Sequence, residues 1–131
     1  MNPNNYKKEP SLSKETETTK QLAILNKTLF EKTEDGFHLF EPIKNGAGKV
    51  IDYVTLAVNP AYEHNSGLKG EQVVGKRISE VLPNFEPMWF SVVQQVLQTG
   101  KAQHVEGFNM DTHRWYSQYI FKLREGQVCL L

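Results

Sequence analysis

The segment of residues 58–83 constrains the fold of this chain more than any other. An apolar run stops at Asn59, whose side-chain oxygen can cap a helix, and Pro60 can fill the first helical position, where a missing N–H costs no hydrogen bond. Gly67 is placed to end that helix, and Gly75 is placed to form the next turn. The segment therefore predicts a strand that leads directly into short helices, with Asn59, Pro60 and Gly75 in structural roles.

Apolar periodicity predicts strands on both sides of this segment and one long helix after it. Strands that precede and follow a group of helices, rather than alternating with them, indicate an α+β fold with an antiparallel sheet. The expected strands cover residues 37–41, 50–58, 103–109, 114–123 and 127 onward, with a turn over 42–49 and the long helix over 86–99.

The N-terminal quarter of the chain, residues 1–33, differs in composition from the rest. Residues 1–18 are polar, and they predict a disordered tail because they cannot bury enough apolar surface to offset the entropy of ordering. Residues 19–33 predict an amphipathic helix, followed by the folded domain over 34–131. The helix could fold back on its own sheet or pair with its copy, and we expect a dimer contact through its apolar stripe. The stripe consists of Leu22, Leu25 and Leu29.

The motif at Asn59 and its surroundings resemble PAS domains, the sensory modules of histidine kinases and related signalling proteins. The resemblance covers about residues 30–131 and implies a PAS-like five-stranded antiparallel sheet, short helices packed on one face, and a cavity between them. The family's closing Asp-Ile-Thr signature, which leads to an output domain, is missing, so we expect a truncated C-terminal end and a longer parent chain. The features that carry the resemblance are Asp52-Tyr53, Asn59-Pro60-Ala61-Tyr62, Thr99-Gly100 and Arg114-Trp115-Tyr116.

Some members of the family hold haem or flavin in this cavity. Haem-binding members carry a histidine on or near the long helix, but residues 86–99 contain none. Light-sensing flavin members need a reactive cysteine in the helical region, whereas the single cysteine, Cys129, falls in the last strand. A zinc site would need clustered ligands, which are also missing. We therefore predict no cofactor and no metal.

The composition argues against several functions. The 15 basic and 15 acidic residues balance, which gives no electrostatic basis for binding nucleic acid or an anionic membrane. The N-terminus lacks the apolar core of a signal peptide, and no apolar run reaches the ~20 residues that span a membrane. We therefore expect a cytoplasmic domain that does not insert into a membrane itself. The longer parent protein can still carry a membrane anchor elsewhere. No nucleophile stands beside a general base, so we expect no catalytic residues and no enzyme in this fragment.

Aromatic residues in the long helix and the later strands are the candidates for a ligand pocket. Strand alternation places Trp115, Ser117 and Tyr119 on one face and Tyr116, Gln118 and Ile120 on the other, but it does not tell which face meets the cavity. Either Tyr116, Ser117 or Gln118 could anchor a ligand. The residues assigned to the pocket are Leu56, Trp89, Val93, Phe108, Trp115, Ser117 and Tyr119.

Two functions fit these expectations. The first is a sensory and signal-transduction module, the input domain of a sensor histidine kinase, that binds a small molecule or relays a conformational signal. The second is a ligand-free domain for dimerisation or protein interaction. The expected partners are a second copy of the chain, a C-terminal output domain and a small-molecule ligand.

Overall fold

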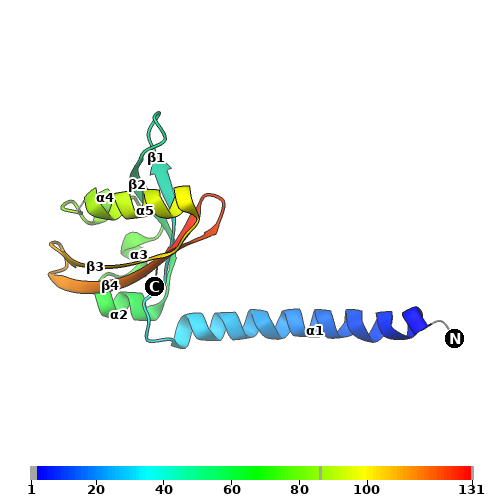
Figure 1. The fold of residues 1–131 in the computed structure, drawn as a ribbon. Coiled ribbons are helices and arrows are strands. Elements are labelled where there is room, and N and C mark those ends of the chain that lie inside the picture. The colour runs from blue at the N-terminus through cyan, green and yellow to red at the C-terminus, as the bar shows by residue number, and fades with distance from the viewer. Residues whose placement is uncertain (1–2, 86, 131) are drawn as a thin grey trace. The chain divides into compact units, whose positions relative to one another are not determined.

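The computed structural model describes residues 3–85 and 87–130, and the chain divides into two compact units between Thr33 and Glu34. The N-terminal unit holds one helix, and the C-terminal unit holds a sheet with four further helices (Figure 1). Within the described ranges, no helix is both long enough and apolar enough to cross a membrane.

The N-terminal unit is the helix α1, from Pro3 to Lys32. The sequence predicts a disordered tail through residue 18 and a helix only from residue 19, whereas the helix in the structure begins at Pro3. The expectation of disorder considered only burial, but Lys and Glu have high helix propensity, which favours a helix independently of burial. The side chains of the apolar stripe are about half exposed, at 51% for Leu22, 49% for Leu25 and 55% for Leu29.

The C-terminal unit is built on a five-stranded antiparallel sheet with the strand order β2-β1-β5-β4-β3. The last strand of the chain, β5, therefore lies at the centre of the sheet, between β1 and β4. This confirms the predicted α+β fold. The strands are β1 (His38–Lys44), β2 (Val50–Val58), β3 (Gln103–Asn109), β4 (Arg114–Arg124) and β5 (Gln127–Leu130), and the helices are α2 (Pro60–Ser66), α3 (Gly70–Val73), α4 (Ile78–Val81) and α5 (Pro87–Thr99).

Two features of the first hairpin differ from the prediction. The expected turn begins at residue 42, but β1 continues through Pro42 to Lys44. Since β1 pairs with β5 only over residues 38–40, one edge of β1 is open at Pro42, and an open edge tolerates proline. The pairing of β1 with β2 also shifts register so that Leu56 has no partner, which makes Leu56 the extra residue of a β-bulge.

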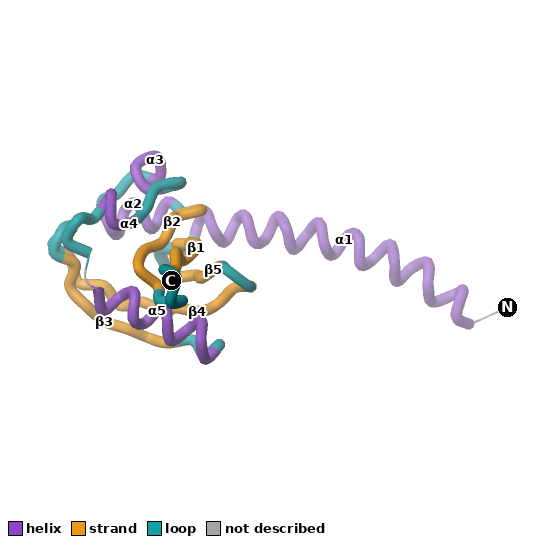
Figure 2. Tube along the Cα trace, turned by 90° about the horizontal axis from the view of Figure 1, so that it is seen from above, coloured by secondary structure: helices purple, strands orange, loops and turns teal. Residues whose placement is uncertain are grey.

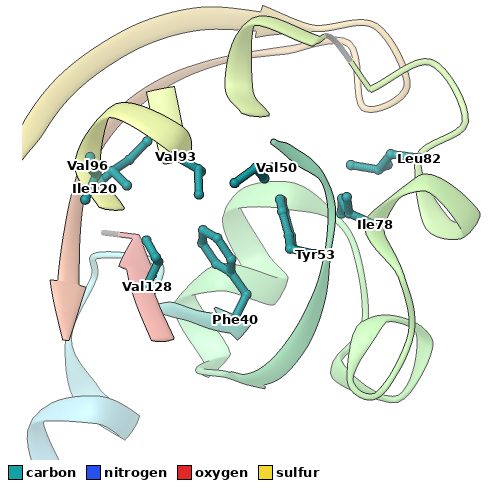
Figure 3. Packing of buried hydrophobic residues seen from close by; sticks show 9 residues of the cluster. All are labelled: Phe40, Val50, Tyr53, Ile78, Leu82, Val93, Val96, Ile120 and Val128. Carbon is teal, nitrogen blue, oxygen red and sulfur yellow. The ribbon is translucent and has the colours of Figure 1, made fainter. Parts of the chain in front are cut away.

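Helices α3, α4 and α5 contact β2, and α5 also contacts β4 (Figure 2). The apolar core fills the space between these helices and the sheet. In Figure 3, Val93 and Val96 of α5 lie beside Ile120 of β4, and the rings of Phe40 and Tyr53 face each other. Each fully buried side chain of this kind contributes about 1.5–3 kcal/mol of transfer free energy. The core comprises Phe40, Val50, Tyr53, Ile78, Leu82, Val93, Val96, Ile120 and Val128.

The segment after β2 folds around its capping residues. Asn59 Oδ1 accepts the Tyr62 backbone N–H at 3.0 Å, and Pro60 is the first residue of α2. Gly67 ends α2 in the left-handed conformation, with φ of 79°. Gly75 also has φ of 79°, and its N–H donates to the Thr55 carbonyl at 2.8 Å, which holds the α3–α4 connection against β2. These glycines permit the backbone reversals that pack short helices against one strand.

Candidate ligand-binding cavity

A cavity of about 60 Å³ lies between the sheet and the helices of the C-terminal unit. A cavity of this size accommodates roughly four to six water-sized atoms, whereas pockets for drug-sized ligands measure about 300–1,000 Å³. Strands β1, β2, β4 and β5 supply one side of its wall, and α2, α4 and α5 supply most of the other. The aromatic and imidazole rings of the wall are His38, Phe40, Tyr53, Tyr62, Phe85, Trp89 and Tyr116.

Ring-to-ring contacts make this wall continuous. The ring centroids of Phe40 and Tyr53 are 4.1 Å apart, and those of His38 and Tyr62 are 5.0 Å apart. Tyr53 also meets Phe85 edge to face at 5.7 Å. Aromatic pairs at these separations add about 0.5–1.5 kcal/mol each beyond the burial of their area, so these contacts stabilise the packing of the wall.

His38 is the buried imidazole of this wall, with only 2% of its surface exposed. Its Nε2 lies 2.8 Å from Thr55 Oγ1, within hydrogen-bond distance. Burial lowers the pKa of His38 to about 3, because the charged imidazolium loses its hydration. At neutral pH His38 is therefore uncharged, and it presents a polar ring without a positive charge.

Two phenols of the wall, Tyr53 and Tyr62, are uncharged as well. Burial, together with the neighbouring Tyr116, raises the pKa of Tyr62 to about 12. Burial also raises the pKa of Tyr53 well above its ordinary value of 10.0. None of the described residues that line the cavity is Asp, Glu, Lys or Arg. The cavity consequently favours an uncharged ligand, because these residues offer no opposite charge to a buried anion or cation.

Two polar atoms of the wall have no partner. Among the described residues, Trp89 Nε1 and Gln118 Oε1 are the buried side-chain polar atoms that make no hydrogen bond to the protein. Trp89 is 4% exposed, and both residues line the cavity. Buried polar groups in native proteins almost always have partners, so a buried donor and a buried acceptor here indicate a site for something other than protein.

The connection from β3 to β4 forms the wall beside Tyr116. Asn109 Oδ1 accepts the backbone N–H groups of Asp111 and Thr112 at 3.0 and 2.9 Å, and Thr112 Oγ1 lies 2.8 Å from the Tyr116 hydroxyl. The Asp111 carboxylate accepts from the backbone and the side chain of Asn84, both at 3.0 Å. These bonds tie the connection to the segment before α5 and fix the position of the Tyr116 ring.

Arg114 anchors the same connection to α2. Its guanidinium donates to the carbonyls of His64 and Asn65 at 3.2 and 2.6 Å, at the C-terminal end of that helix. Carbonyls at a helix C-terminus lack intrahelical partners, so a cation there satisfies them. Arg114 therefore positions the start of β4 against the helix that supplies Tyr62 to the cavity.

Asp52, the acidic residue of the motif, has a structural role. Its Oδ1 accepts the backbone N–H groups of Tyr53 and Ser79 at 2.9 and 3.2 Å, and its Oδ2 accepts the Ser79 hydroxyl at 2.5 Å. Ser79 lies in the first turn of α4, where N–H groups have no intrahelical acceptor. Asp52 thus caps α4 from the neighbouring strand and holds β2 beside it.

The structure brings two of the predicted pocket residues together. Trp89 and Val93, one turn apart on α5, both line the cavity. Tyr116 and Gln118, considered as polar anchors on the alternative face of β4, line it as well.

The pocket residues assigned to β4 lie on the outer face of the strand, a face that the sequence had left undecided. Trp115 is 78% exposed and Tyr119 is 47% exposed, so both point away from the cavity. Ser117 lies on the same outer face, where its Oγ is 2.7 Å from His104 Nε2. Ile120 is 1% exposed and belongs to the core, which shows that the even-numbered residues of β4 face inward.

Two further predicted pocket residues lie elsewhere. Phe108 is the cross-strand partner of Trp115, and their ring centroids are 5.6 Å apart on the outer face. Leu56 is the extra residue of the bulge in β2 and does not line the cavity, whereas Tyr53 on the same strand does. A bulge changes which residues of a strand face inward, and alternation alone cannot reveal it.

Sequence reasoning missed His38, Tyr53 and Tyr62 as cavity residues. The alternation of His38 and Phe40 in β1 was a signal for one inward face, but no sequence motif marked His38 as a cavity residue. Tyr62 follows the capping residue of α2, and its direction depends on how α2 packs, which no local pattern specifies. The described residues contain no group of three or more His, Cys, Asp or Glu side chains that could hold a metal, and Cys129 is buried in β5.

A family model described as the PAS fold matches residues 47–131, more than half of the chain. The chain therefore belongs to the PAS fold family. Comparison with curated proteins gives no match.

Solved structures share the fold at low sequence identity. A domain of an HTR-like protein from Haloarcula marismortui ATCC 43049 is 20% identical, with a TM-score of 0.54 over 75% of this chain and 94% of that one. A domain of the sensory box sensor histidine kinase/response regulator from Geobacter sulfurreducens is 15% identical, with a TM-score of 0.54 over 83% and 90%. An RNA-binding Light-Oxygen-Voltage receptor is 17% identical, with a TM-score of 0.60 over 86% of this chain and 32% of the receptor. Identities this low show the fold alone.

Proposed function

We propose that this chain is the sensory input module of a larger signalling protein, a sensor histidine kinase, and that a small molecule in the cavity is its input. The observation that carries the proposal is the pair of unpartnered polar atoms, on Trp89 and Gln118, in residues that line a largely apolar and aromatic cavity. The likeness to a domain of a sensor histidine kinase/response regulator supports the choice of parent.

The cavity wall includes residues of two paired strands, β1 and β5. They include His38 at the start of β1 and Leu130 at the end of β5, and these two residues are cross-strand partners. A ligand can shift an output only through different affinities for two conformations. We propose that occupancy changes the pairing of β1 with β5, and that the strain passes to the segments that enter and leave the sheet.

We infer binding rather than catalysis. His38 is neutral and lies beside a threonine hydroxyl, and the lining residues that the structure describes include no Asp, Glu, Lys or Arg that could stabilise a transition state. The volume of about 60 Å³ favours a ligand of a few atoms over haem or flavin.

A thermal-shift screen tests the proposal. Compounds of four to six non-hydrogen atoms are added to the wild-type chain and to Val93→Phe, whose larger side chain fills part of the cavity. At least one compound should raise the wild-type Tm in a concentration-dependent manner and leave Val93→Phe unchanged. Val93→Ile, which adds one methylene, serves as the milder variant if Val93→Phe is poorly folded. Equal shifts in all variants would refute binding in the cavity.

The exposed leucines of α1 favour a second candidate function, dimerisation. Leu22, Leu25 and Leu29 recur at the three- and four-residue spacing of a coiled-coil seam. Analytical ultracentrifugation of Leu25→Asp, with Ile24→Asp as the matched control off the stripe, tests it. We expect a wild-type dimer that Leu25→Asp converts to a monomer and Ile24→Asp preserves. A wild-type monomer at all concentrations would refute this candidate.

A further inference from the structure

The geometry points to the chemical class of the ligand: a small uncharged molecule of the short-chain amide type, which accepts a hydrogen bond from Trp89 Nε1–H and donates one to Gln118 Oε1. This inference rests on the proposed function, since it takes the cavity as the site where the input ligand binds. It adds which atoms recognise the ligand and which related molecules the cavity rejects.

The size of the cavity limits the ligand first. About 60 Å³ accommodates roughly four to six non-hydrogen atoms. The packing of α5 against β3 leaves little room to expand, because a Cβ on Gly107 would lie 2.7 Å from Trp89 Cζ2. The indole ring is thus held against the backbone of β3, and its position cannot adapt easily to a larger molecule.

The charge of the wall limits the ligand next. The described lining residues include no acidic or basic side chain, and His38 is neutral. A carboxylate in this cavity would lose its hydration without gaining a cationic partner. An ammonium group would likewise lose its hydration without gaining an anionic partner. An uncharged molecule avoids both penalties.

The two unpartnered atoms then specify the polar group. The indole Nε1 is a donor only, and the amide Oε1 of Gln118 is an acceptor only. A primary amide offers a carbonyl oxygen and an N–H₂ group on one carbon, so a single group carries the acceptor that the indole needs and the donor that the Gln118 oxygen needs. A ketone of the same size satisfies only the indole, and an alkane satisfies neither.

Three probes of five non-hydrogen atoms each distinguish these classes: propionamide, butanone as an acceptor without a donor, and propionate as the anion. A ligand of this size binds with a Kd of roughly micromolar at best, so titrations should extend to about 100 mM. The chain has two tryptophans, and Trp115 is exposed on the outer face. Comparison of wild-type and Trp115→Phe spectra therefore assigns the Trp89 indole N–H signal in ¹H–¹⁵N NMR.

We expect propionamide to shift the Trp89 indole signal saturably and to leave that of Trp115 in place. Butanone and propionate should each bind at least about tenfold more weakly than propionamide. Butanone leaves the buried Gln118 oxygen without a donor, and propionate brings a charge that has no cationic partner. Gln118→Met, which removes the acceptor at similar volume, should weaken propionamide binding about tenfold. Gln98→Met, at an exposed position of α5, should bind as the wild type does.

Several outcomes would overturn the inference. Tighter binding of propionate than of propionamide, or equal binding to Gln118→Met, would refute the ligand class while leaving a ligand-binding cavity in place. No saturable shift with any probe would also refute the ligand class and would indicate that water satisfies the two atoms. The thermal-shift screen with Val93→Phe would then decide the proposed function on its own.

Discussion

Replacing Asn59 with alanine is expected to destabilise the C-terminal unit by about 3 kcal/mol, more than the loss of a helix cap explains. The side chain is 1% exposed and makes three hydrogen bonds. Its Oδ1 accepts the backbone N–H groups of Tyr62 at 3.0 Å and Phe37 at 2.7 Å, and its Nδ2 donates to the Asp35 carbonyl at 2.9 Å. Asn59 therefore joins the start of α2 to the segment that leads into β1.

The magnitude follows from these bonds. The cap to Tyr62 contributes about 1 kcal/mol, as caps typically do. Each of the two bonds to the segment before β1 adds about 1 kcal/mol, since alanine removes their partner in a region with little access to water. Their sum is about 3 kcal/mol, a large fraction of the stability of an ordinary domain.

Urea unfolding at equilibrium, followed by far-UV circular dichroism, measures the loss. With an m-value of about 1–1.5 kcal/mol/M, the midpoint should fall by about 2–3 M. Asn65→Ala is the matched control, because the Asn65 side chain is exposed and makes one long bond to the Glu34 carbonyl, at 3.3 Å. That variant should lose less than about 0.5 kcal/mol.

A loss of about 1 kcal/mol or less for Asn59→Ala would refute the reasoning. It would mean that only the cap contributes, and that the bonds to Asp35 and Phe37 do not stabilise the domain. An equal loss for Asn65→Ala would show that the region responds to any change in polarity.

Two further predictions concern the cavity wall. Since burial places the folded-state pKa of His38 at about 3, below its unfolded value of 6.5, its contribution to stability is complete above pH 6.5 and is lost as the pH falls toward 3. Protonation of His38 in the unfolded state should lower the free energy of unfolding by about 2 kcal/mol between pH 7.5 and pH 5. His38→Gln should lack this pH-dependent loss, whereas the exposed control His64→Gln should keep it. Parallel pH profiles for the wild type and both variants would contradict this prediction. Gly107→Ala should lower the free energy of unfolding by about 1–3 kcal/mol, because the added Cβ clashes with Trp89. Gly46→Ala, which adds a Cβ in open space, should stay within about 0.5 kcal/mol of the wild type in the same urea assay. An unchanged stability of Gly107→Ala would show that the indole can move aside.

The fold was largely predictable from the sequence because its signals are local. The strand and helix limits around Asn59 depend on capping and on turn residues such as Gly67 and Gly75, which act within a few residues. Leu22, Leu25 and Leu29 likewise indicated a helix. Its start was not predicted, because helix propensity without burial has no apolar pattern to mark it.

The cavity was predictable only in part because it depends on tertiary packing. Alternation in β4 divides Tyr116 and Gln118 from Trp115 and Tyr119, but the inward face is set by where α5 packs. Large aromatic residues favour burial on average, and that tendency led to the wrong choice for Trp115, which is exposed. The bulge at Leu56 arises from pairing with β1 and has no local signature in the sequence.

Native mass spectrometry of freshly purified protein tests the central claim, that the cavity holds a small molecule, most directly. With an excess of the compound that raises the wild-type Tm most in the thermal-shift screen added to the protein, we predict that the wild-type chain carries one extra mass of roughly 60–100 Da, the mass of a molecule with four to six non-hydrogen atoms. The same spectrum of Val93→Phe, whose cavity is partly filled, should show bare polypeptide. Bare polypeptide for both proteins, or the same extra mass on both, would contradict the claim.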